Sequence, residues 1–427
     1  MVAYHQGGIA EPQFEGWIVK MEQIETLVIG GGQAGLAMSY CLRQRGQEHV
    51  ILERHAVAER WRSERWDSLA FQSPNWNVRL PGFAFSAADP DAFASRDEIF
   101  RFIEDYAAVI RAPLRCGQPA TSLRRTSDGT RLTVETPAGS FEAKNVVVAT
   151  GPFQRPVAPL QIGGSALHLH SSRYRNPQSL PPGAVLVIGS ANSGAQIAEE
   201  LFSAGRRVFL SVSRHRRIPR RYRGKDYTWW YLAFNEGDTT VDRRGEEPAP
   251  RLLTGVGGGR DLDLHQLAAD GVVLLGRVLG GRDGQLAIAD DLGDNLARGD
   301  ASFVDFTRQA DELAVRQGLD LPPSDADVAS LRHRADVTDS IRKLDLSTAG
   351  ISTIIWANGY RYDFGWVELP VFASGTSSSG RVPMHKRGVT AVPGVYFLGL
   401  PWLHKLKSAF LNGVGEDAEY LADHIAR

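Results

Sequence analysis

Residues 24–53 read IETLVIGGGQAGLAMSYCLRQRGQEHVILE, and this stretch decides the fold. An apolar run ends in glycines, a helix-like segment with small residues near its start follows, and a second apolar run closes at Glu53. This order predicts a βαβ unit of strand, glycine turn, helix and strand. Gly30, Gly32 and Gly35 fit the pattern G-x-G-x-x-G. In that pattern the glycines permit the tight turn, the approach of a pyrophosphate and the packing of helix on strand.

The acidic end of the second strand favours a dinucleotide over a plain glycine turn. A helix N-terminus holds phosphates through its free N–H groups and its dipole. Glu53 stands where a carboxylate can bind two ribose hydroxyls. Because a strand precedes the turn, a helix follows it and an acid stands at the right distance, the motif predicts a nucleotide site.

A second unit of the same kind occupies residues 184–212, AVLVIGSANSGAQIAEELFSAGRRVFLSV. Gly189 and Gly194 take the first and last glycine positions, but Ala191 replaces the middle glycine. Its methyl group would hold a pyrophosphate slightly farther away. The alternative is a domain of the same fold that has lost its nucleotide. Two such units in one chain suggest two nucleotide-binding domains.

The second unit ends in Ser213 and Arg214 instead of an acid. A carboxylate there would repel a 2′-phosphate, whereas serine and arginine would bind it. This end favours NADPH over NADH, and a solvated basic loop remains the alternative. Because the two strand ends differ in charge, we assign FAD to the first site and NADPH to the second, with hydride passing from nicotinamide to flavin.

Composition excludes several other classes of protein. The chain has 427 residues, with 48 Lys and Arg against 49 Asp and Glu, so bulk charge does not predict nucleic-acid binding. Two cysteines are too few for a disulfide scaffold, and no metal site is predicted. Without an apolar run of about 18 residues or a signal peptide, we expect no membrane association and a cytoplasmic location. The sequence leaves a homodimer open.

The expected fold is α/β, with an inserted NADPH domain interrupting a FAD domain. We expect residues 1–20 to be a disordered extension. The FAD-binding domain takes 21–155 and returns over 361–427, and the NADPH-binding domain takes 156–360. Within the latter, the polar, glycine-rich stretch of about 214–343 predicts loops and short helices.

Several motifs together resemble the single-component, NADPH-using flavin monooxygenases, which include YUCCA-type, dimethylaniline-type and Baeyer–Villiger enzymes. They are GGGQAG, ERWRSERWDSL, ATG at 149–151, LHSSRYRNP at 169–177, GSANSG and ANGY. The likeness covers nearly all of 21–427 and is nearest to uncharacterised bacterial flavin-dependent oxidoreductases. His170 and Tyr174 match part of the monooxygenase fingerprint, with a hinge or core histidine as the alternative for His170. Tyr174 stands where a strict Baeyer–Villiger signature has Trp.

The resemblance carries cofactor contacts onto particular residues of this chain. For FAD they are Gly30, Gly32, Gln33, Ala34, Gly35, Glu53, Arg54, Trp61, Arg62, Gly151 and Gly415. For NADPH they are Gly189, Ser190, Asn192, Ser193, Gly194, Ser213 and Arg214.

The same resemblance implies a monooxygenase that uses O2 and a C4a-(hydro)peroxyflavin to oxygenate a small organic substrate, preferably at N or S. Baeyer–Villiger oxygenation and a non-oxygenating NADPH:FAD oxidoreductase are the alternatives. In dimethylaniline-type relatives an asparagine lies near the flavin, and that position is Gln72 here, with Asn75 close by. These two amides are the predicted catalytic residues, and a loop amide that satisfies backbone groups is the alternative for both.

Overall fold

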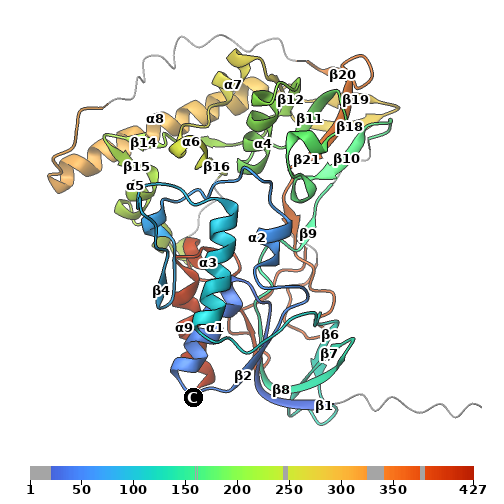
Figure 1. Ribbon diagram of the computed structural model, residues 1–427, viewed down its shortest axis with the longest axis vertical. Coiled ribbons are helices and arrows are strands. Elements are labelled where there is room, and N and C mark those ends of the chain that lie inside the picture. Colours follow the sequence, from blue (N-terminus) through green and yellow to red (C-terminus); the bar gives the residue numbers. More distant parts are fainter. Residues whose placement is uncertain (1–20, 159, 161, 244–248, 325–340, 376–379) are drawn as a thin grey trace, which may run out of the picture.

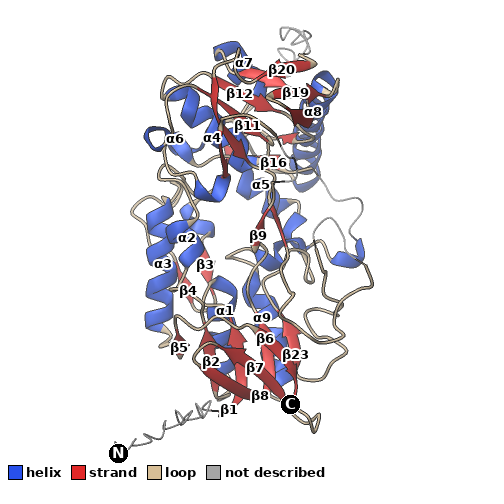
Figure 2. Ribbon diagram, turned by 90° about the vertical axis from the view of Figure 1, so that its right-hand side faces the viewer, coloured by secondary structure: helices blue, strands red, loops and turns tan. Residues whose placement is uncertain are grey.

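The computed structural model describes residues 21–158, 160, 162–243, 249–324, 341–375 and 380–427. The expected extension at 1–20 lies outside these residues. The described chain forms two halves, each built on a mainly parallel β-sheet (Figure 1). Figure 2 shows the halves stacked along the long axis of the molecule.

The first half contains a seven-stranded sheet. Its spatial order is β5 (Leu114–Arg115), β2 (His49–Leu52), β1 (Met21–Ile29), β8 (Gly139–Val148), β7 (Leu132–Thr136) and β6 (Ser122–Arg125), with β23 (Val395–Phe397) also on β8. The central strand β1 pairs in parallel with β2 and β8. The far side of β8 pairs with antiparallel β7 along its first part and with parallel β23 along its last part. Strand β23 therefore returns the end of the chain to the sheet that began it.

Helices cover the first sheet. They are α1 (Gln33–Gln44), α3 (Arg96–Val109) and α9 (Val414–Ile425), and the short helix α2 (Glu59–Ser63) packs against α3. Helices α1 and α9 lie side by side although they stand at opposite ends of the chain (Figure 1). Helix α3 begins at a capping box, in which Ser95 and Glu98 satisfy each other's backbone N–H groups. Its buried side chains recur at helical spacing and join the same apolar core as strand β1.

The second half contains five parallel strands. Their order is β10 (Leu167–His170), β21 (Ile351–Trp356), β11 (Ala184–Ile188), β12 (Val208–Ser211) and β17 (Val273–Leu275). One face packs against α4 (Asn192–Ser203), α7 (Leu264–Asp270) and the start of α8 (Leu292–Gln317). The other face packs against an antiparallel sheet of β18 (Val278–Arg282), β19 (Gln285–Ile288) and β20 (Lys343–Asp345). These two sheets and their helices confirm the predicted α/β class.

The expectation of loops and short helices at 214–343 is wrong for α8, which has 26 residues. Two glycines hide this helix in the sequence. Gly293 lies in its first turn, and Gly299 lies where a Cβ would come within 2.5 Å of the ring of His215. Glycine is therefore needed at 299 for packing, although it lowers helix propensity. Two shorter helices, α5 (Tyr227–Ala233) and α6 (Val256–Gly259), lie in the same stretch.

Short strand pairs join the remaining segments. The antiparallel pair β9 (Arg155–Pro156) and β22 (Tyr360–Arg361) lies where the chain passes between the halves (Figure 2). The others are β3 (Arg79–Leu80) with β4 (Phe83–Ala84), β13 (Arg216–Arg217) with β16 (Arg251–Leu252), and β14 (Arg221–Tyr222) with β15 (Lys225–Asp226). None of the described helices is long and apolar enough to cross a membrane.

Candidate functional site: two glycine turns joined by a pair of amides

The first glycine turn follows β1 and is shaped by close backbone contacts. Gly30 has φ +120°, and a Cβ there would lie 2.5 Å from the carbonyl oxygen of Ala149. A Cβ on Gly35 would lie 1.9 Å from the carbonyl oxygen of Gly30. A Cβ on Gly32 would meet nothing within 4 Å. The outer two glycines are thus required by the protein itself, whereas the middle position is open on the side where a ligand can approach.

Glu53 is already tied to this turn. Its Oε2 accepts a hydrogen bond from the Gly31 N–H at 2.7 Å, and its Oε1 accepts one from the His55 N–H at 3.0 Å. Hydrogen bonds to an ionised carboxylate are stronger than neutral ones. The carboxylate is therefore held at the end of β2, beside the open position at Gly32.

The returning C-terminal segment reaches the same turn. The side-chain nitrogen of Gln33 donates to the Ala409 carbonyl at 2.6 Å. Ala34 is buried below Gly399, whose added Cβ would come within 2.5 Å of the Ala34 Cβ. Gly415 lies where a Cβ would meet the ring of Pro81 at 2.6 Å. The turn is therefore contacted by segments that lie far from it in the sequence.

The segment from Arg54 to Arg62 lies at the border of this region. Trp61 is half-buried, with its ring 5.8 Å from that of Phe71 and a guanidinium 5.6 Å away. Arg54 and Arg62 are exposed, and Arg62 forms an ion pair with Glu59 on the same helix. Gly151 follows the end of β8. The roles of these four residues in cofactor binding stay predictions.

The second turn repeats the construction of the first. Gly189 has φ +105°, and a Cβ there would lie 2.7 Å from the Ala357 carbonyl oxygen. A Cβ on Gly194 would lie 1.8 Å from the carbonyl oxygen of Gly189. Ala191 has φ −69° and ψ 180°, which any residue adopts without strain. The alanine is therefore compatible with the geometry of the turn.

The polar side chains of the second turn hold its surroundings in place. Ser190 Oγ accepts a hydrogen bond from the Ser213 N–H at 3.0 Å, and Asn192 Oδ1 accepts one from the Leu253 N–H at 2.8 Å. Ser193 is half-buried in the first turn of α4. These two hydrogen bonds connect the turn to the segments that follow β12 and β16, without help from a ligand.

A cavity of about 700 Å³ opens at the end of β12. Its lining includes the predicted Ser213 and Arg214 together with Arg277 and Arg298, which sequence reasoning missed. Arg277 binds Asp291 at 2.5 Å, whereas Arg214 and Arg298 are exposed and have no charged partner among the described residues. Arg277 follows β17 and Arg298 lies on α8, so no local motif could have grouped them. The three guanidinium groups outnumber the carboxylates of Asp291 and Asp294 in the lining, and this balance suits an anion.

The two predicted catalytic amides have different surroundings. Gln72 Oε1 accepts a hydrogen bond from Asn192 Nδ2 at 3.2 Å, so a residue of the first half contacts the second glycine turn. The Gln72 carbonyl accepts a further one from Arg220 Nη1 at 2.8 Å. Asn75 Nδ2 instead donates to the Asp89 carbonyl at 2.9 Å, and its Oδ1 has no partner among the described residues. Asn75 therefore satisfies a loop carbonyl, and its catalytic role stays a prediction.

His170 and Tyr174 are both buried in the second half. The two ring nitrogens of His170 contact Ser172 Oγ and the Gly359 carbonyl, each at 3.0 Å. Burial lowers the pKa of His170, which favours the neutral form of the ring. Tyr174 donates to Glu200 Oε2 at 2.9 Å. In this structure His170 ties the end of β10 to the segment that follows β21, and Tyr174 contacts helix α4.

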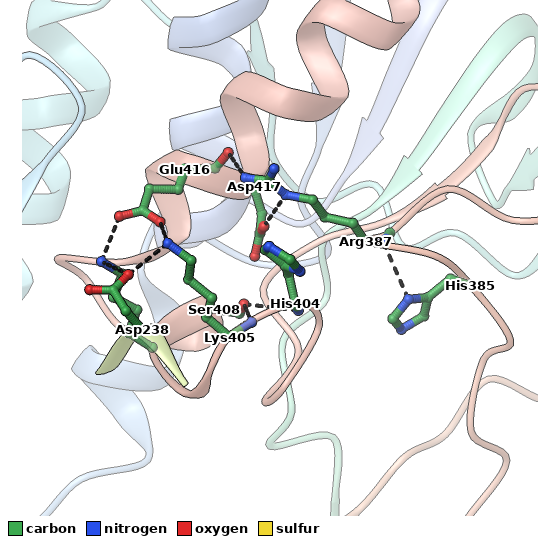
Figure 3. Close-up of polar contacts among 10 residues, drawn as sticks. Asp238, His385, Arg387, His404, Lys405, Ser408, Glu416 and Asp417 are labelled. Atoms are coloured by element: carbon green, nitrogen blue, oxygen red, sulfur yellow. Dashed lines mark hydrogen bonds and ion pairs between the residues drawn. The ribbon is translucent and has the colours of Figure 1, made fainter. Parts of the chain in front are cut away.

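A charged cluster joins the two halves at the start of α9 (Figure 3). Lys405 Nζ contacts Asp238 Oδ1 at 2.6 Å and Glu416 Oε2 at 2.8 Å, and Lys407 Nζ contacts the same two carboxylates. The Asp238 and Glu416 carboxylates raise the pKa of Lys405. Asp238 belongs to the second half and Glu416 to α9. Each half is therefore fixed against the other on this side as well.

Comparison with known proteins gives the chain its family. Residues 27–229 match the family model described as pyridine nucleotide-disulphide oxidoreductase. A relative from Geobacillus kaustophilus, an uncharacterized CzcO-like oxidoreductase, is 32% identical over 94% of this chain and 98% of its own length. A probable indole-3-pyruvate monooxygenase, YUCCA1 of Arabidopsis thaliana, is 31% identical over 41% of this chain and 44% of its own length.

A solved structure shares the fold of this chain. The flavin-containing monooxygenase of Stenotrophomonas maltophilia superposes with a TM-score of 0.63 at 20% identity, covering 95% of this chain and 98% of that one. This likeness confirms the predicted fold of two Rossmann-like domains. The predicted resemblance is confirmed as well. The chain belongs to the family of CzcO-like oxidoreductases, and over part of its length it is also similar to a YUCCA-type monooxygenase.

Proposed function

We propose that the chain is a monooxygenase that uses NADPH, FAD and O2 to add one oxygen atom to a nitrogen or sulfur atom of a small organic substrate. The hydrogen bond between Gln72 and Asn192 carries this proposal, because it joins the half that contains the first glycine turn to the second glycine turn itself. A reaction in which a nicotinamide reduces a flavin needs two such sites close together.

The residues of the first turn fit FAD. The open position at Gly32 admits a pyrophosphate, and the N-terminus of α1 offers free N–H groups beside it. Glu53 stands at the end of β2 with its carboxylate already oriented by two backbone N–H groups. When bound, the flavin supplies hydride acceptance and the activation of O2. The chain supplies binding, orientation and exclusion of water.

The residues of the second site fit NADPH better than NADH. Arg214 and Arg298 line the cavity at the end of β12, beside Ser213. Arginine forms strong, bidentate hydrogen bonds with phosphate, and a 2′-phosphate is the group that distinguishes the two coenzymes. We assign these arginines to the 2′-phosphate.

Oxygenation at N or S is favoured over insertion beside a carbonyl. Tyr174 stands where a strict Baeyer–Villiger signature has Trp, and its hydroxyl is occupied by Glu200. Gln72 offers the flavin site a carboxamide that both donates and accepts hydrogen bonds. We propose that this amide orients the reacting groups.

Rapid-mixing spectroscopy tests the function. The purified chain is reduced anaerobically with NADPH, with NADH in parallel, and is then mixed with O2. A transient absorption band blue-shifted from oxidised flavin supports the monooxygenase, and amines, thioethers and ketones then identify the substrate class. Direct return to oxidised flavin with release of peroxide, both alone and with each substrate class, would favour the non-oxygenating oxidoreductase.

We further propose the domain limits 21–155 with 361–427 for FAD and 156–360 for NADPH. The pairing of β9 with β22 supports them, because both crossings between the halves lie at that pair.

A further inference from the structure

Arg220 is a charged residue in an unusual position. Its side chain is almost fully buried, with 1% of the residue exposed. The guanidinium lies 4.3 Å from the centre of the Phe93 ring. Its Nε and Nη2 donate to the two carboxylate oxygens of Asp226 at 2.9 and 3.1 Å. A buried charge of this kind must be paired and hydrogen-bonded, and this bidentate pair meets that need.

The remaining guanidinium nitrogen crosses between the halves of the molecule. Arg220 lies in the second half, and its Nη1 reaches the carbonyl oxygen of Gln72 in the first half at 2.8 Å. The side chain of Gln72 reaches back to Asn192 in the second nucleotide turn. Gln72 is thus held at both ends, through its carbonyl by Arg220 and through its carboxamide by Asn192.

The surroundings leave little freedom for this contact. A Cβ on Gly255 would lie 2.1 Å from the Phe71 carbonyl, and one on Gly259 would lie 2.5 Å from the Phe93 ring. The N–H of Arg220 donates to Asp261 Oδ1 at 2.6 Å. Asp226 also accepts a hydrogen bond from the Thr228 N–H at 2.7 Å. This bond caps the N-terminus of α5. Both partners of the ion pair are therefore anchored by the backbone.

Lysine could not replace this arginine. A planar guanidinium presents donors in a fixed fork, so it can hold Asp226 on one edge and the Gln72 carbonyl on another. An ammonium group is a point charge on a flexible stem and lacks that fork. The geometry of Arg220 is therefore specific for the orientation of the Gln72 segment.

We propose that Arg220 is a positioning residue that fixes Gln72 between the two nucleotide sites and thereby sets the rate at which NADPH reduces the flavin. It acts through Gln72, whose side chain is held in turn by Asn192. The inference rests on the proposed function, because it assigns Gln72 a place beside the flavin. Small displacements of groups that position reactants reduce rates by about a hundredfold.

The test compares Arg220→Lys with Arg221→Lys. Arg221 is the neighbouring, exposed arginine, and it donates to the carbonyls of Gly258 and Gly259 instead of to Gln72. We expect R220K to keep its FAD and to bind NADP⁺ within about threefold of the original chain, while flavin reduction by NADPH slows by about tenfold to a hundredfold. R221K should reduce at the original rate.

A double substitution separates positioning from general damage. If Arg220 acts through Gln72, R220K should slow the original chain but not a Q72A chain, since the carboxamide to be positioned is gone. Equal slowing in both backgrounds would overturn the inference, and so would an unchanged rate in R220K. If R220K loses FAD, D226N serves as the second variant, with a smaller slowing expected that again disappears in Q72A.

Amide hydrogen exchange gives a readout that does not depend on turnover. We expect faster exchange in a peptide spanning Gln72 to Asn77 in R220K and not in R221K. Unchanged exchange there would contradict the positioning role. Failure of the original chain to be reduced by NADPH would count against the proposed function, whereas normal reduction in R220K would count against this inference alone.

Discussion

The two glycine turns of this molecule share one construction and differ in two places. In each, the first glycine is pressed against the carbonyl of an alanine at the end of a neighbouring strand, Ala149 or Ala357. In each, the last glycine lies under the carbonyl of the first. They differ at the middle position and at the end of the following strand. The residues at the shared positions are therefore required by the fold. We expect the residues at the differing positions to depend on which ligand each turn binds.

The largest expected effects come from the shared positions. G35A and G194A each place a methyl group within 2 Å of a backbone carbonyl, at 1.9 and 1.8 Å. We expect each to lower the free energy of unfolding by about 1–3 kcal/mol, as overpacking does. G35A should also lose FAD, whereas G194A should keep FAD and lose reduction by NADPH. Thermal unfolding, flavin content and anaerobic reduction measure these results.

G293A is the matched control for both substitutions. Gly293 lies in the exposed first turn of α8, and a Cβ there would meet nothing within 4 Å. Replacing it should stabilise the chain slightly, by about 0.4–1 kcal/mol, because the unfolded state loses freedom. Equal losses of FAD in G35A and G194A would show that the two turns do not serve separate ligands.

A substitution at the middle position of the first turn should change FAD affinity and leave stability almost unchanged. Gly32 has φ −91° and ψ −171°, and the space beside it is open. G32A should therefore leave the unfolding of the FAD-free chain within about 0.5 kcal/mol of the original. FAD affinity should fall by about tenfold or more, since a methyl group would occupy the path of the pyrophosphate. Titration of the FAD-free G32A chain with FAD measures this affinity. An unaltered affinity would mean that the pyrophosphate does not lie beside Gly32.

The cavity arginines after β12 and on α8 are expected to control the choice of coenzyme. R214A removes one of the exposed guanidinium groups of the cavity, and R298A removes another. A hydrogen bond to a charged group contributes about 1.5–3 kcal/mol, so each should raise the KM for NADPH by about tenfold or more. NADH lacks the 2′-phosphate and serves as the internal control. A parallel rise in the KM for NADH would assign the cavity to another part of the coenzyme.

The features that could be predicted from the sequence are those formed by residues close together in the chain. Both turns and the α/β class follow from runs of residues in which strand, glycines and helix are adjacent, such as 24–53. The cavity arginines could not be found in this way, since Arg277 and Arg298 join Arg214 only through the fold. The same holds for Gln72, whose partners Asn192 and Arg220 stand 120 and 148 positions away. Contacts at that separation depend on how the two halves dock.

The smallest effect should come from A191G, which gives the second turn the glycine that the first turn has. Ala191 already has ordinary backbone angles, so no strain is released. Glycine is a better N-cap than alanine but makes the unfolded chain freer, and the two effects offset each other to within about 0.5 kcal/mol. We expect NADPH affinity to change by less than about threefold, as judged by titration of the flavin spectrum. A large gain in affinity would mean that the Ala191 methyl group obstructs the pyrophosphate. The open middle position would then matter equally in both turns, and the difference between them would lie at the strand ends alone.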